Sequence, residues 1–290
     1  MLLTQVLING ILLGGLYACM AIGFSVIWGV MNIINLAHGS MVLSGAYITY
    51  VLHAHLGLDP LLGLPIAGLA MFGVGFLLQR YLLNRVVQAS VFMTLMVTFG
   101  LDMVLTNINL SIFSADLRSI TPPYSGTGLE LGEVRISYPR LGVFVVAILL
   151  TLGLHAFMNR TRVGNAIKAT SFDREAAGLV GMNAPWVYSI TFGIGAFMAG
   201  VTGSLVAVTQ SFTPVVGASY TMKSFVIVVL GGLGSIPGAI VGGMILGVAE
   251  NLTSIILNPG LRDAVSFILL VVILVLRPRG IFGKRFYAEV

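Results

Sequence analysis

The sequence has few charged residues and a single cysteine. Only 9% of its 290 residues are charged, against roughly 25% in soluble domains, and this excludes most soluble enzymes. Cys19 alone cannot form an intramolecular disulfide, so cysteine usage carries no information about the redox compartment. Apolar side chains dominate instead: 57% of the residues are hydrophobic and the mean hydropathy is +1.01. This composition is typical of a protein embedded in a lipid bilayer.

Known catalytic and metal-binding motifs are also missing. The sequence contains no HExxH, GxSxG or CxxC pattern and no closely spaced pair of loop carboxylates. The 15 basic residues lie at the ends of apolar runs instead of forming a stripe with aromatic residues, which argues against a nucleic-acid partner. We therefore expect no catalytic residue, no metal site, no cofactor bound by this chain and no nucleic acid.

Apolar runs follow one another along the whole chain and predict an all-α, polytopic transmembrane bundle. A helical span needs about 20 apolar residues. The runs lie at residues 4–32, 40–54, 61–79, 86–112, 140–158, 185–209, 221–257 and 263–277. The first run lacks a basic segment before it and a cleavage site after it, so it is a span and not a removable signal. We expect about eight spans in one domain over residues 1–290.

Basic residues predict which loops face the cytoplasm. They gather after the third run, after the fifth run and at the end of the chain, at Arg80, Arg85, Arg160, Arg162, Lys168, Arg174, Arg277, Arg279, Lys284 and Arg285. Positive residues favour the cytoplasmic side. The N-terminus then lies outside and the C-terminus inside, residues 113–139 form an outer loop, and residues 159–184 form a cytoplasmic loop.

A glycine-rich stretch interrupts the run at 221–257, which is too long for one ordinary span. Helix-stopping residues cluster at Gly231, Gly232, Gly234, Pro237 and Gly238. No Lys-Ser or Lys-Thr follows in the spacing of a phosphate-binding loop, so that reading is excluded. We expect a broken helix near 231–238. It is either a re-entrant break that lines a transport pathway or a plain cytoplasmic turn between two short spans.

Polar residues follow the first span at a spacing of three. Asn32, Asn35 and His38 would share one face if the helix continued through them, with Gly39 ending it. Such a face at the end of a membrane helix points into the bundle or to the interface. Pathway lining and simple helix packing or anchoring both remain open.

Three ionisable residues lie in or beside apolar runs, namely Asp102, Lys223 and Glu250. An ionisable group at the bilayer centre costs about 3 kcal/mol on insertion scales, so each needs a partner, a cavity or an interface. Lys223 could equally extend its amine to the outer headgroups. The sequence does not say which of these residues pair.

The loop at 159–183 carries the signals of a short amphipathic helix over residues 170–181. Thr170 and Asp173 have capping-box spacing, and Gly181 supplies a stop. Apolar side chains share one face, at Ala176, Leu179 and Val180. The alternative is a routine cytoplasmic loop, but the length of the loop and its apolar face favour docking of a partner.

Three segments resemble the permease subunits of branched-chain amino-acid ABC importers, the LivH type. They are NIINLAHGSMVLSGAY (32–47), RTRVGNAIKATSFDREAAGLVGMN (160–183) and VVLGGLGSIPGAIVGGMILG (228–247). The middle segment resembles the EAA loop of importer permeases. The resemblance covers essentially the whole chain, and it implies a multi-pass permease domain in the bacterial inner membrane, surrounded by lipid.

The resemblance also implies an assembly. It consists of a second permease, related or identical, two ATPase subunits that bind ATP and magnesium, and an extracytoplasmic substrate-binding protein. The residues expected to couple to the ATPase are Thr170, Asp173, Arg174, Glu175, Ala176, Ala177, Leu179 and Gly181. Those expected on the translocation pathway are Asn32, Asn35, His38, Lys223, Gly231, Gly232, Gly234 and Glu250.

The cargo and the energy source leave alternatives open. Branched-chain amino acids come first by resemblance, while urea, short amides and other neutral amino acids are carried by similar permeases. An ion-coupled secondary transporter is the rival from another class, and it would make Asp102 and Glu250 ion ligands.

Overall fold

The computed structural model describes residues 2–87, 89–131 and 134–283, so Lys284 and Arg285 lie outside the described residues. The chain folds mainly into helices, with one short antiparallel hairpin. The elements are α1 (Leu2–Met31), α2 (His38–Leu56), α3 (Pro60–Tyr81), α4 (Val91–Phe113), β1 (Gly128–Leu131), β2 (Val134–Ser137), α5 (Tyr138–Arg160), α6 (Arg162–Phe172), α7 (Arg174–Leu179), α8 (Ala184–Thr209), α9 (Gly217–Gly231), α10 (Ile236–Ile256) and α11 (Arg262–Leu276).

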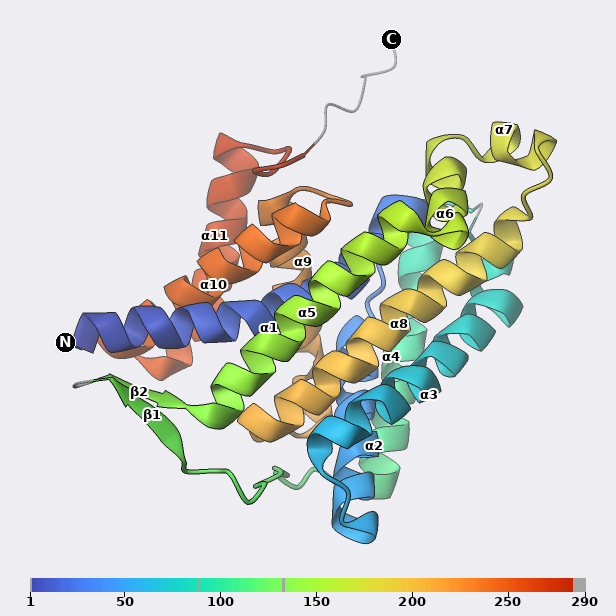
Figure 1. Ribbon diagram of the computed structural model, residues 1–290. Helices are drawn as coiled ribbons and strands as arrows, with labels where there is room; N and C mark the ends of the chain where they lie inside the picture. The colour runs from blue at the N-terminus through green and yellow to red at the C-terminus, as the bar shows by residue number, and fades with distance from the viewer. Residues whose placement is uncertain (1, 88, 132–133, 284–290) are drawn as a thin grey trace.

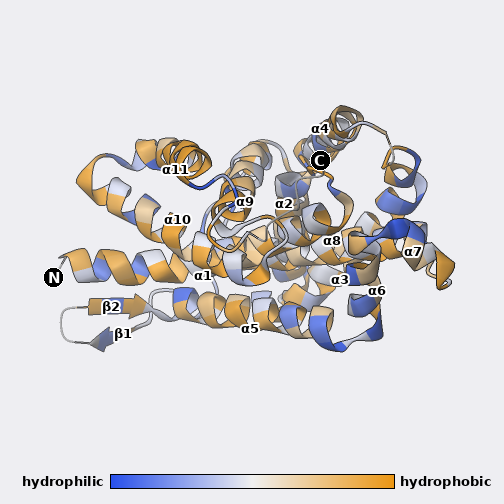
Figure 2. Ribbon diagram, turned by 90° about the horizontal axis from the view of Figure 1, so that it is seen from above, coloured by the Kyte–Doolittle hydropathy of each residue, from blue (hydrophilic) through white to orange (hydrophobic). Residues whose placement is uncertain are grey.

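The predicted polytopic bundle is confirmed. Among the described residues, eight helical segments are long and apolar enough to cross a membrane, and Figure 2 shows apolar residues along most of their length. The short run predicted at 40–54 is α2, a 19-residue helix whose first half is buried in the bundle. Hydrophilic residues are most concentrated around α6 and α7 (Figure 2).

The two long connections lie at opposite ends of the molecule (Figure 1). One end carries β1 and β2, and we call it the hairpin end. Here the side chain of Gln5 near the start of α1 exchanges two 2.9 Å hydrogen bonds with the backbone of Arg135 in β2. The other end carries α6 and α7, and we call it the α6–α7 end. The sequence predicted both loops but not the β-hairpin.

Glycine allows the central helices to approach closely. Along the contact between α1 and α10, a Cβ atom on Gly14 would lie 2.7 Å from Met244 Cα, and one on Gly247 would lie 2.5 Å from Gly10 O. Between α2 and α8, a Cβ on Gly45 would collide with the backbone of Gly200. Close backbone packing through small residues is the usual way in which membrane helices associate. This packing fixes the core around α1, α2, α8 and α10.

Two helices begin inside the bundle instead of at its surface. The ring of His38 at the start of α2 lies 3.0 Å from the carbonyl oxygen of Met20, about 16 Å before the end of α1 at 1.5 Å per residue. Gly39 in α2 touches Gly217 at the start of α9. The chain therefore returns into the bundle through the non-helical residues 32–37 before α2, and before α9 through residues 210–216, which end in a 3-10 turn at Pro214–Val216.

Protein groups satisfy the backbone of these two segments. Thr98 and Thr221 donate to the carbonyl oxygens of Ile34 and Leu36 at 2.9 and 3.0 Å. Phe212 exchanges backbone hydrogen bonds of 2.8 and 3.0 Å with Arg118. Irregular backbone at membrane depth requires such partners, because lipid offers none.

The first and second halves of the bundle follow the same path in opposite directions. In each half a long helix is followed by a short return, a helix that starts inside the bundle and two further helices: α1 to α4, then α8 to α11. The packing is reciprocal, because α3 lies along α8 whereas α10 lies along α1. We call these units the first half and the second half.

The predicted helix break near 231–238 is confirmed as residues 232–235, between α9 and α10. Gly232 and Gly234 have φ values of 103° and 73°, which favour glycine. Gly234 packs on Gly29 near the end of α1, and Ile281 after α11 donates to the Leu230 carbonyl oxygen at 2.8 Å. The break therefore lies at the end of the bundle where α1 and α11 end. This position fits a turn between two spans, the second of the two interpretations.

Candidate functional site

An ionic cluster lies between α1, α9, α10 and α11, with Glu250 and Lys223 buried and the Asp263 side chain 57% exposed. The ammonium nitrogen of Lys223 on α9 lies 3.0 Å from Glu250 Oε1 and 3.3 Å from Asp263 Oδ1. The hydroxyl of Tyr17 on α1 donates to Glu250 Oε2 at 2.6 Å, and Ser266 on α11 donates to Glu250 Oε1 at 3.0 Å. Two of the predicted pathway residues, Lys223 and Glu250, are thus brought into direct contact.

Burial makes this cluster energetically demanding. Glu250 is 1% exposed, and the Lys223 side chain is 11% exposed. Two charges removed from water lose several kcal/mol of hydration each, which their attraction recovers only with good geometry and further hydrogen bonds. Tyr17 and Ser266 supply these bonds, since together with Lys223 they occupy both carboxylate oxygens. Of the two alternatives for Lys223, the structure therefore shows the amine paired with Glu250 and not extended toward headgroups.

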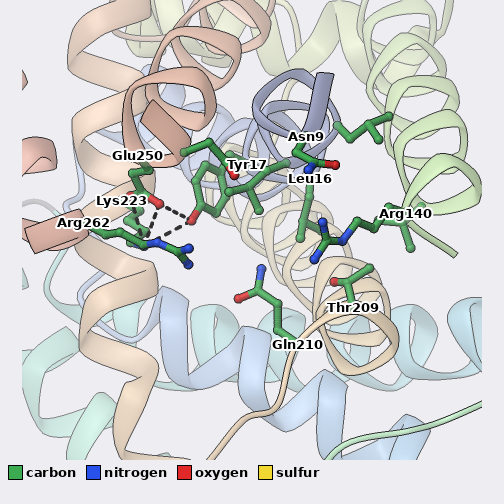
Figure 3. A pocket seen from close by; sticks show the side chains of 13 residues that line it. Asn9, Leu16, Tyr17, Arg140, Thr209, Gln210, Lys223, Glu250 and Arg262 are labelled. Carbon is green, nitrogen blue, oxygen red and sulfur yellow. Dashed lines mark hydrogen bonds and ion pairs between the residues drawn. The ribbon is translucent and has the colours of Figure 1, made fainter. Parts of the chain in front are cut away.

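A cavity of about 340 Å³ lies next to the cluster. Its walls include the α1 side chains Leu12, Leu13 and Leu16. Polar groups complete the lining, and Figure 3 shows the guanidinium groups of Arg140 and Arg262 extending into it from opposite sides. A second cavity of about 310 Å³ adjoins it at Asn9 and Arg140 and reaches the β-hairpin at Thr127 and Arg135. Together the two cavities run from the hairpin end to the buried ions.

Four members of this site were not expected from the sequence: Tyr17, Arg140, Asp263 and Ser266. A tyrosine or serine in an apolar run reads as packing, and Arg140 and Asp263 lie at helix starts where charges are common. The signal that pointed to the site was the presence of two ionisable residues, Lys223 and Glu250, in an apolar run, where each requires a partner. No pattern in the sequence names those partners, because Tyr17 is 233 residues away from Glu250.

The prediction that Asn32, Asn35 and His38 share a helix face is wrong. Asn32 ends α1 in the left-handed region (φ 53°) and is exposed. Asn35 lies in the non-helical return, where its side chain accepts a bond from Ala37 N at 3.2 Å and so forms an Asx turn. His38 opens α2, and Gly39 therefore continues that helix instead of ending one. These side-chain preferences for turns outweigh helical periodicity.

The structure uses His38 and Asn35 within the packed interior. Both are fully buried, and His38 also meets the ring of Phe24 edge to face at 5.5 Å. The glycines Gly231, Gly232 and Gly234 lie in close backbone packing around the turn at the α6–α7 end. These five residues and Asn32 do not join the Lys223–Glu250 cluster.

The single helix predicted over 170–181 is also wrong, because two helices share that segment. Thr170 lies in the last turn of α6, where its hydroxyl donates to Ala166 O at 2.9 Å. Asp173 is the N-cap of α7, and its carboxylate accepts from the backbone N–H groups of Glu175 and Ala176 at 2.9 Å. A carboxylate caps a helix N-terminus well, and its charge suits the helix dipole. Gly181 ends the segment with φ 86°.

An apolar surface on this segment is uncovered. Phe172, Leu179 and Val180 are 82%, 90% and 73% exposed, whereas Ala177 is buried. Below the surface, the Arg174 guanidinium lies 5.8 Å from the ring centre of Tyr188 on α8. We call Phe172, Leu179 and Val180 the α7 surface. It extends from the last residue of α6 to the residue that follows α7, and α7 contacts α8.

Asp102 does not belong to the ionic cluster. It lies on α4, which packs against α2, whereas Glu250 on α10 faces α1, α9 and α11. Among the described residues, no three His, Cys, Asp or Glu side chains lie together where they could hold a metal ion. The two carboxylates of the ion-coupled alternative are therefore not brought together.

Comparison with known proteins identifies relatives over nearly the whole chain. Residues 6–274 match the family described as branched-chain amino acid transport system / permease component. The permease protein BraD of Pseudomonas aeruginosa is 32% identical, with 97% of this chain and 95% of that protein covered. The permease protein LivH of Escherichia coli K12 is 34% identical, with the same two coverages.

More distant matches were also found. The permease protein LivM of Escherichia coli K12 is 27% identical over 92% of this chain and 67% of its own length. A solved structure of PsaBC from Streptococcus pneumoniae in complex with Fab is weakly similar, with 14% identity, a TM-score of 0.47 and coverage of 93% of this chain and 91% of that one. The family match and the identities above 30% lead to one conclusion: this chain belongs to the permease component family of branched-chain amino acid transport systems.

Proposed function

We propose that this chain is the membrane-spanning permease subunit of an ATP-binding-cassette importer for branched-chain amino acids. Its N-terminus lies outside, and its α6–α7 end faces the cytoplasm. The permeases BraD and LivH, named for high-affinity branched-chain amino acid transport, support this cargo. The chain forms part of the translocation pathway, and ATP hydrolysis takes place on separate subunits.

One observation carries the proposal: the α7 surface is apolar and exposed, and it lies on α7 and the residues that flank it, at the end of the bundle. Apolar side chains that are 73% to 90% exposed outside the spans are suited to a groove in a partner protein. The partner proposed here is an ATPase subunit. The coupling residues are those of α7 and its flanks, with Asp173 fixing the start of the helix and Ala177 anchoring it.

Force applied to α7 has a route into the bundle. Arg174 stacks on Tyr188 of α8, and α6 turns tightly from α5 because a Cβ on Gly164 would lie 2.6 Å from Met158 Cα. Both α5 and α8 run from this end to the hairpin end (Figure 1). Closure of the ATPase pair would therefore tilt α5 and α8 together and alternate access to the pathway.

The partners follow from the same family relationship. LivH and LivM of one bacterium both match this chain, which favours a related and not identical permease as the second membrane subunit. An extracytoplasmic binding protein would deliver the amino acid at the hairpin end. Two ATPase subunits, with their ATP and magnesium, would dock at the α6–α7 end.

Transport by the reconstituted assembly tests the proposal. Proteoliposomes containing both permeases, the ATPase subunits and the binding protein should accumulate leucine, isoleucine and valine only when ATP is present on the ATPase side. Uptake by this chain alone that follows an ion gradient and ignores ATP would overturn the proposal. Accumulation of urea or short amides in place of branched-chain amino acids would retain the importer but correct the cargo.

A variant of the α7 surface tests the coupling step separately. Leu179→Asp should reduce ATP-driven uptake at least tenfold, because the charge would be buried in the ATPase groove, while the purified chain keeps its thermal stability. The matched control is Leu117→Asp. Leu117 is the same residue type, is 71% exposed and lies outside the spans, in the outer loop. Equal losses from both variants would contradict the role of α7.

A further inference from the structure

The cavity beside the buried ions has the chemistry of an amino-acid site. Its volume of about 340 Å³ is at the small end of the range for ligand pockets, as suits a single small molecule. One wall is aliphatic, with Leu12, Leu13 and Leu16 on α1 and Val143 on α5. The rest of the lining is polar, and Figure 3 shows Arg140, Arg262 and Gln210 around the cavity. An amphipathic ligand with a branched apolar side chain matches this division.

The cationic side chains that line the cavity differ in whether they have partners in the protein. Lys223 is neutralised by Glu250 and Asp263, and Arg262 lies beside this cluster with one guanidinium nitrogen bound to Ser254 at 2.7 Å. Arg140 has neither an ion pair nor a hydrogen bond with the described part of the chain. Its guanidinium extends into the cavity from the side opposite Arg262 (Figure 3). A planar, permanently charged guanidinium is well suited to a bidentate carboxylate.

The lining also provides acceptors for an ammonium group. Glu250 cannot serve, since both of its oxygens are occupied by Lys223, Tyr17 and Ser266. Asn251 donates its amide N–H to Gly247 O at 3.0 Å, which leaves its oxygen as an acceptor. Gln210 adds a second amide at the cavity (Figure 3). Neutral acceptors suit the ammonium group of a zwitterion, whose charge is already balanced by its own carboxylate.

We propose that this cavity binds an aliphatic α-amino acid as its zwitterion, with the carboxylate on Arg140 and the branched side chain against Leu12 and Leu16. The inference rests on the proposed function and deepens it, because this chain then contacts the cargo itself. The adjoining cavity at Asn9 and the β-hairpin is the route of entry. The Lys223–Glu250 cluster closes the inner side of the site.

Direct binding to the purified permease pair with its ATPase subunits, in nanodiscs and without the binding protein, tests this site. Radiolabelled leucine should bind, and leucinamide, which lacks the carboxylate, should compete at least tenfold more weakly than unlabelled leucine. Arg140→Gln should weaken leucine binding at least tenfold and remove the difference between leucine and leucinamide. Arg140→Lys should keep part of the affinity, because it retains the positive charge but loses the planar guanidinium that can bind both carboxylate oxygens.

The matched control is Arg80→Gln, an exposed arginine at the other end of the bundle. It should leave leucine binding unchanged. Equal binding by the Arg140→Gln and Arg80→Gln variants would overturn the site, as would equal competition by leucinamide. Leucine binding that disappears when the nanodiscs contain anionic lipid would also overturn it, because Arg140 would then hold a lipid headgroup.

The same preparation separates this inference from the proposed function. If ATP-driven leucine uptake with the binding protein is normal but does not depend on Arg140, the site is wrong and the importer stands. If ATP drives no branched-chain amino acid uptake while leucine binding still depends on Arg140, the proposed function is wrong and the site stands.

Discussion

The first and second halves of the bundle share one backbone path but carry different interiors. Gly39 and Gly217 touch where α2 and α9 begin, so they mark equivalent positions. Six residues later, the first half has Gly45, whose Cα faces the backbone of Gly200 on α8. The second half has Lys223 at that point, bound to Glu250 and Tyr17. At this position the first half has close glycine packing, and the second half has an ion pair.

This difference shows that the backbone path of a half does not require a buried ion cluster. The first half forms the same turn into the bundle with uncharged groups, so an ion cluster is not required for the backbone path. Buried ion pairs are weak contributors to stability when compared with well-packed apolar residues. The cluster in the second half, next to the cavity, therefore indicates a role beyond packing. Four predictions, each with its control variants, break or sharpen the comparison.

The largest effect should come from Glu250→Ala. Removal of one partner leaves the buried Lys223 charge without its closest carboxylate and should lower the free energy of unfolding by about 3 to 5 kcal/mol. Chemical unfolding of the purified protein in mild detergent, followed by tryptophan fluorescence, measures this loss.

The double variant Lys223→Met with Glu250→Leu is the matched control. It removes both charges and keeps their volume, so it should recover most of the lost stability. In the first half, Asp102→Ala should cost less than Glu250→Ala, because Asp102 forms no ion pair with a cation in the described part of the chain. A double variant as unstable as Glu250→Ala alone would contradict the account of the pair.

A smaller effect is expected where the two halves touch. In Gly39→Ala, the added Cβ would collide with the Gly217 carbonyl, so α2 and α9 must separate. Overpacking of this kind costs about 1 to 3 kcal/mol. The melting temperature in detergent should fall accordingly.

Gly100→Ala is the control for this substitution. It also replaces a helical glycine, in α4, but its Cβ would meet open space. It should therefore be neutral or stabilising by up to about 1 kcal/mol, through helix propensity alone. Equal destabilisation by the two variants would show that the junction is not tightly packed.

The connection between the two halves includes α6 and α7, and the start of α7 depends on Asp173. Asp173→Ala removes the acceptor for Glu175 N and Ala176 N and should cost about 1 kcal/mol of local stability. Hydrogen exchange at residues 174–179 should accelerate, while exchange in α8 stays unchanged. Asp173→Asn keeps an N-cap oxygen and should show a smaller acceleration. Faster exchange throughout α8 would instead mean that α7 does not move independently.

The smallest effect concerns the N-caps of two equivalent helices. Asp59 caps α3, where Ser235 caps α10. Burial, followed by the neighbouring Asp59 carboxylate, raises the pKa of Tyr124 in the loop between α4 and β1. Stability linked to this proton is present below the ordinary tyrosine pKa of about 10 and is lost as the pH rises through the raised pKa.

Asp59→Asn keeps the cap and removes the charge, so the pKa of Tyr124 should fall toward its ordinary value. An ultraviolet titration of phenolate absorbance, taken as the difference from Tyr124→Phe in each background, measures it. A pKa of Tyr124 that is unchanged in the Asp59→Asn variant would assign the shift to burial alone.

The spans and the two long connections could be predicted from the sequence because the bilayer imposes them directly. A run of apolar residues and a cluster of Arg160 and Arg162 at its end need no tertiary information. The starts of α2 and α9 inside the bundle could not be predicted in this way. The return before α2 depends on hydrogen bonds from Thr98 and Thr221, and the return before α9 depends on the backbone of Arg118.

The candidate site was predictable in part for the same reason. Burial of Lys223 and Glu250 signals that each needs a partner, but their pairing depends on how α9 and α10 fold back on each other. In the 170–181 segment the apolar side chains were recognised, whereas the helix start was placed three residues early. Thr170 and Asp173 both carry capping oxygens, and only the turn between α6 and α7 decides that Asp173 is used.

The most direct test of the central claim is a crosslink from position 179. Cys19 is fully buried, so Leu179→Cys supplies the accessible thiol on the described part of the chain. In membranes containing the whole assembly, a bifunctional thiol reagent should join this residue to an ATPase subunit, and an impermeant thiol label added from outside should not reach it. Labelling of position 179 from the outside, or the absence of any crosslink to an ATPase subunit, would contradict the account.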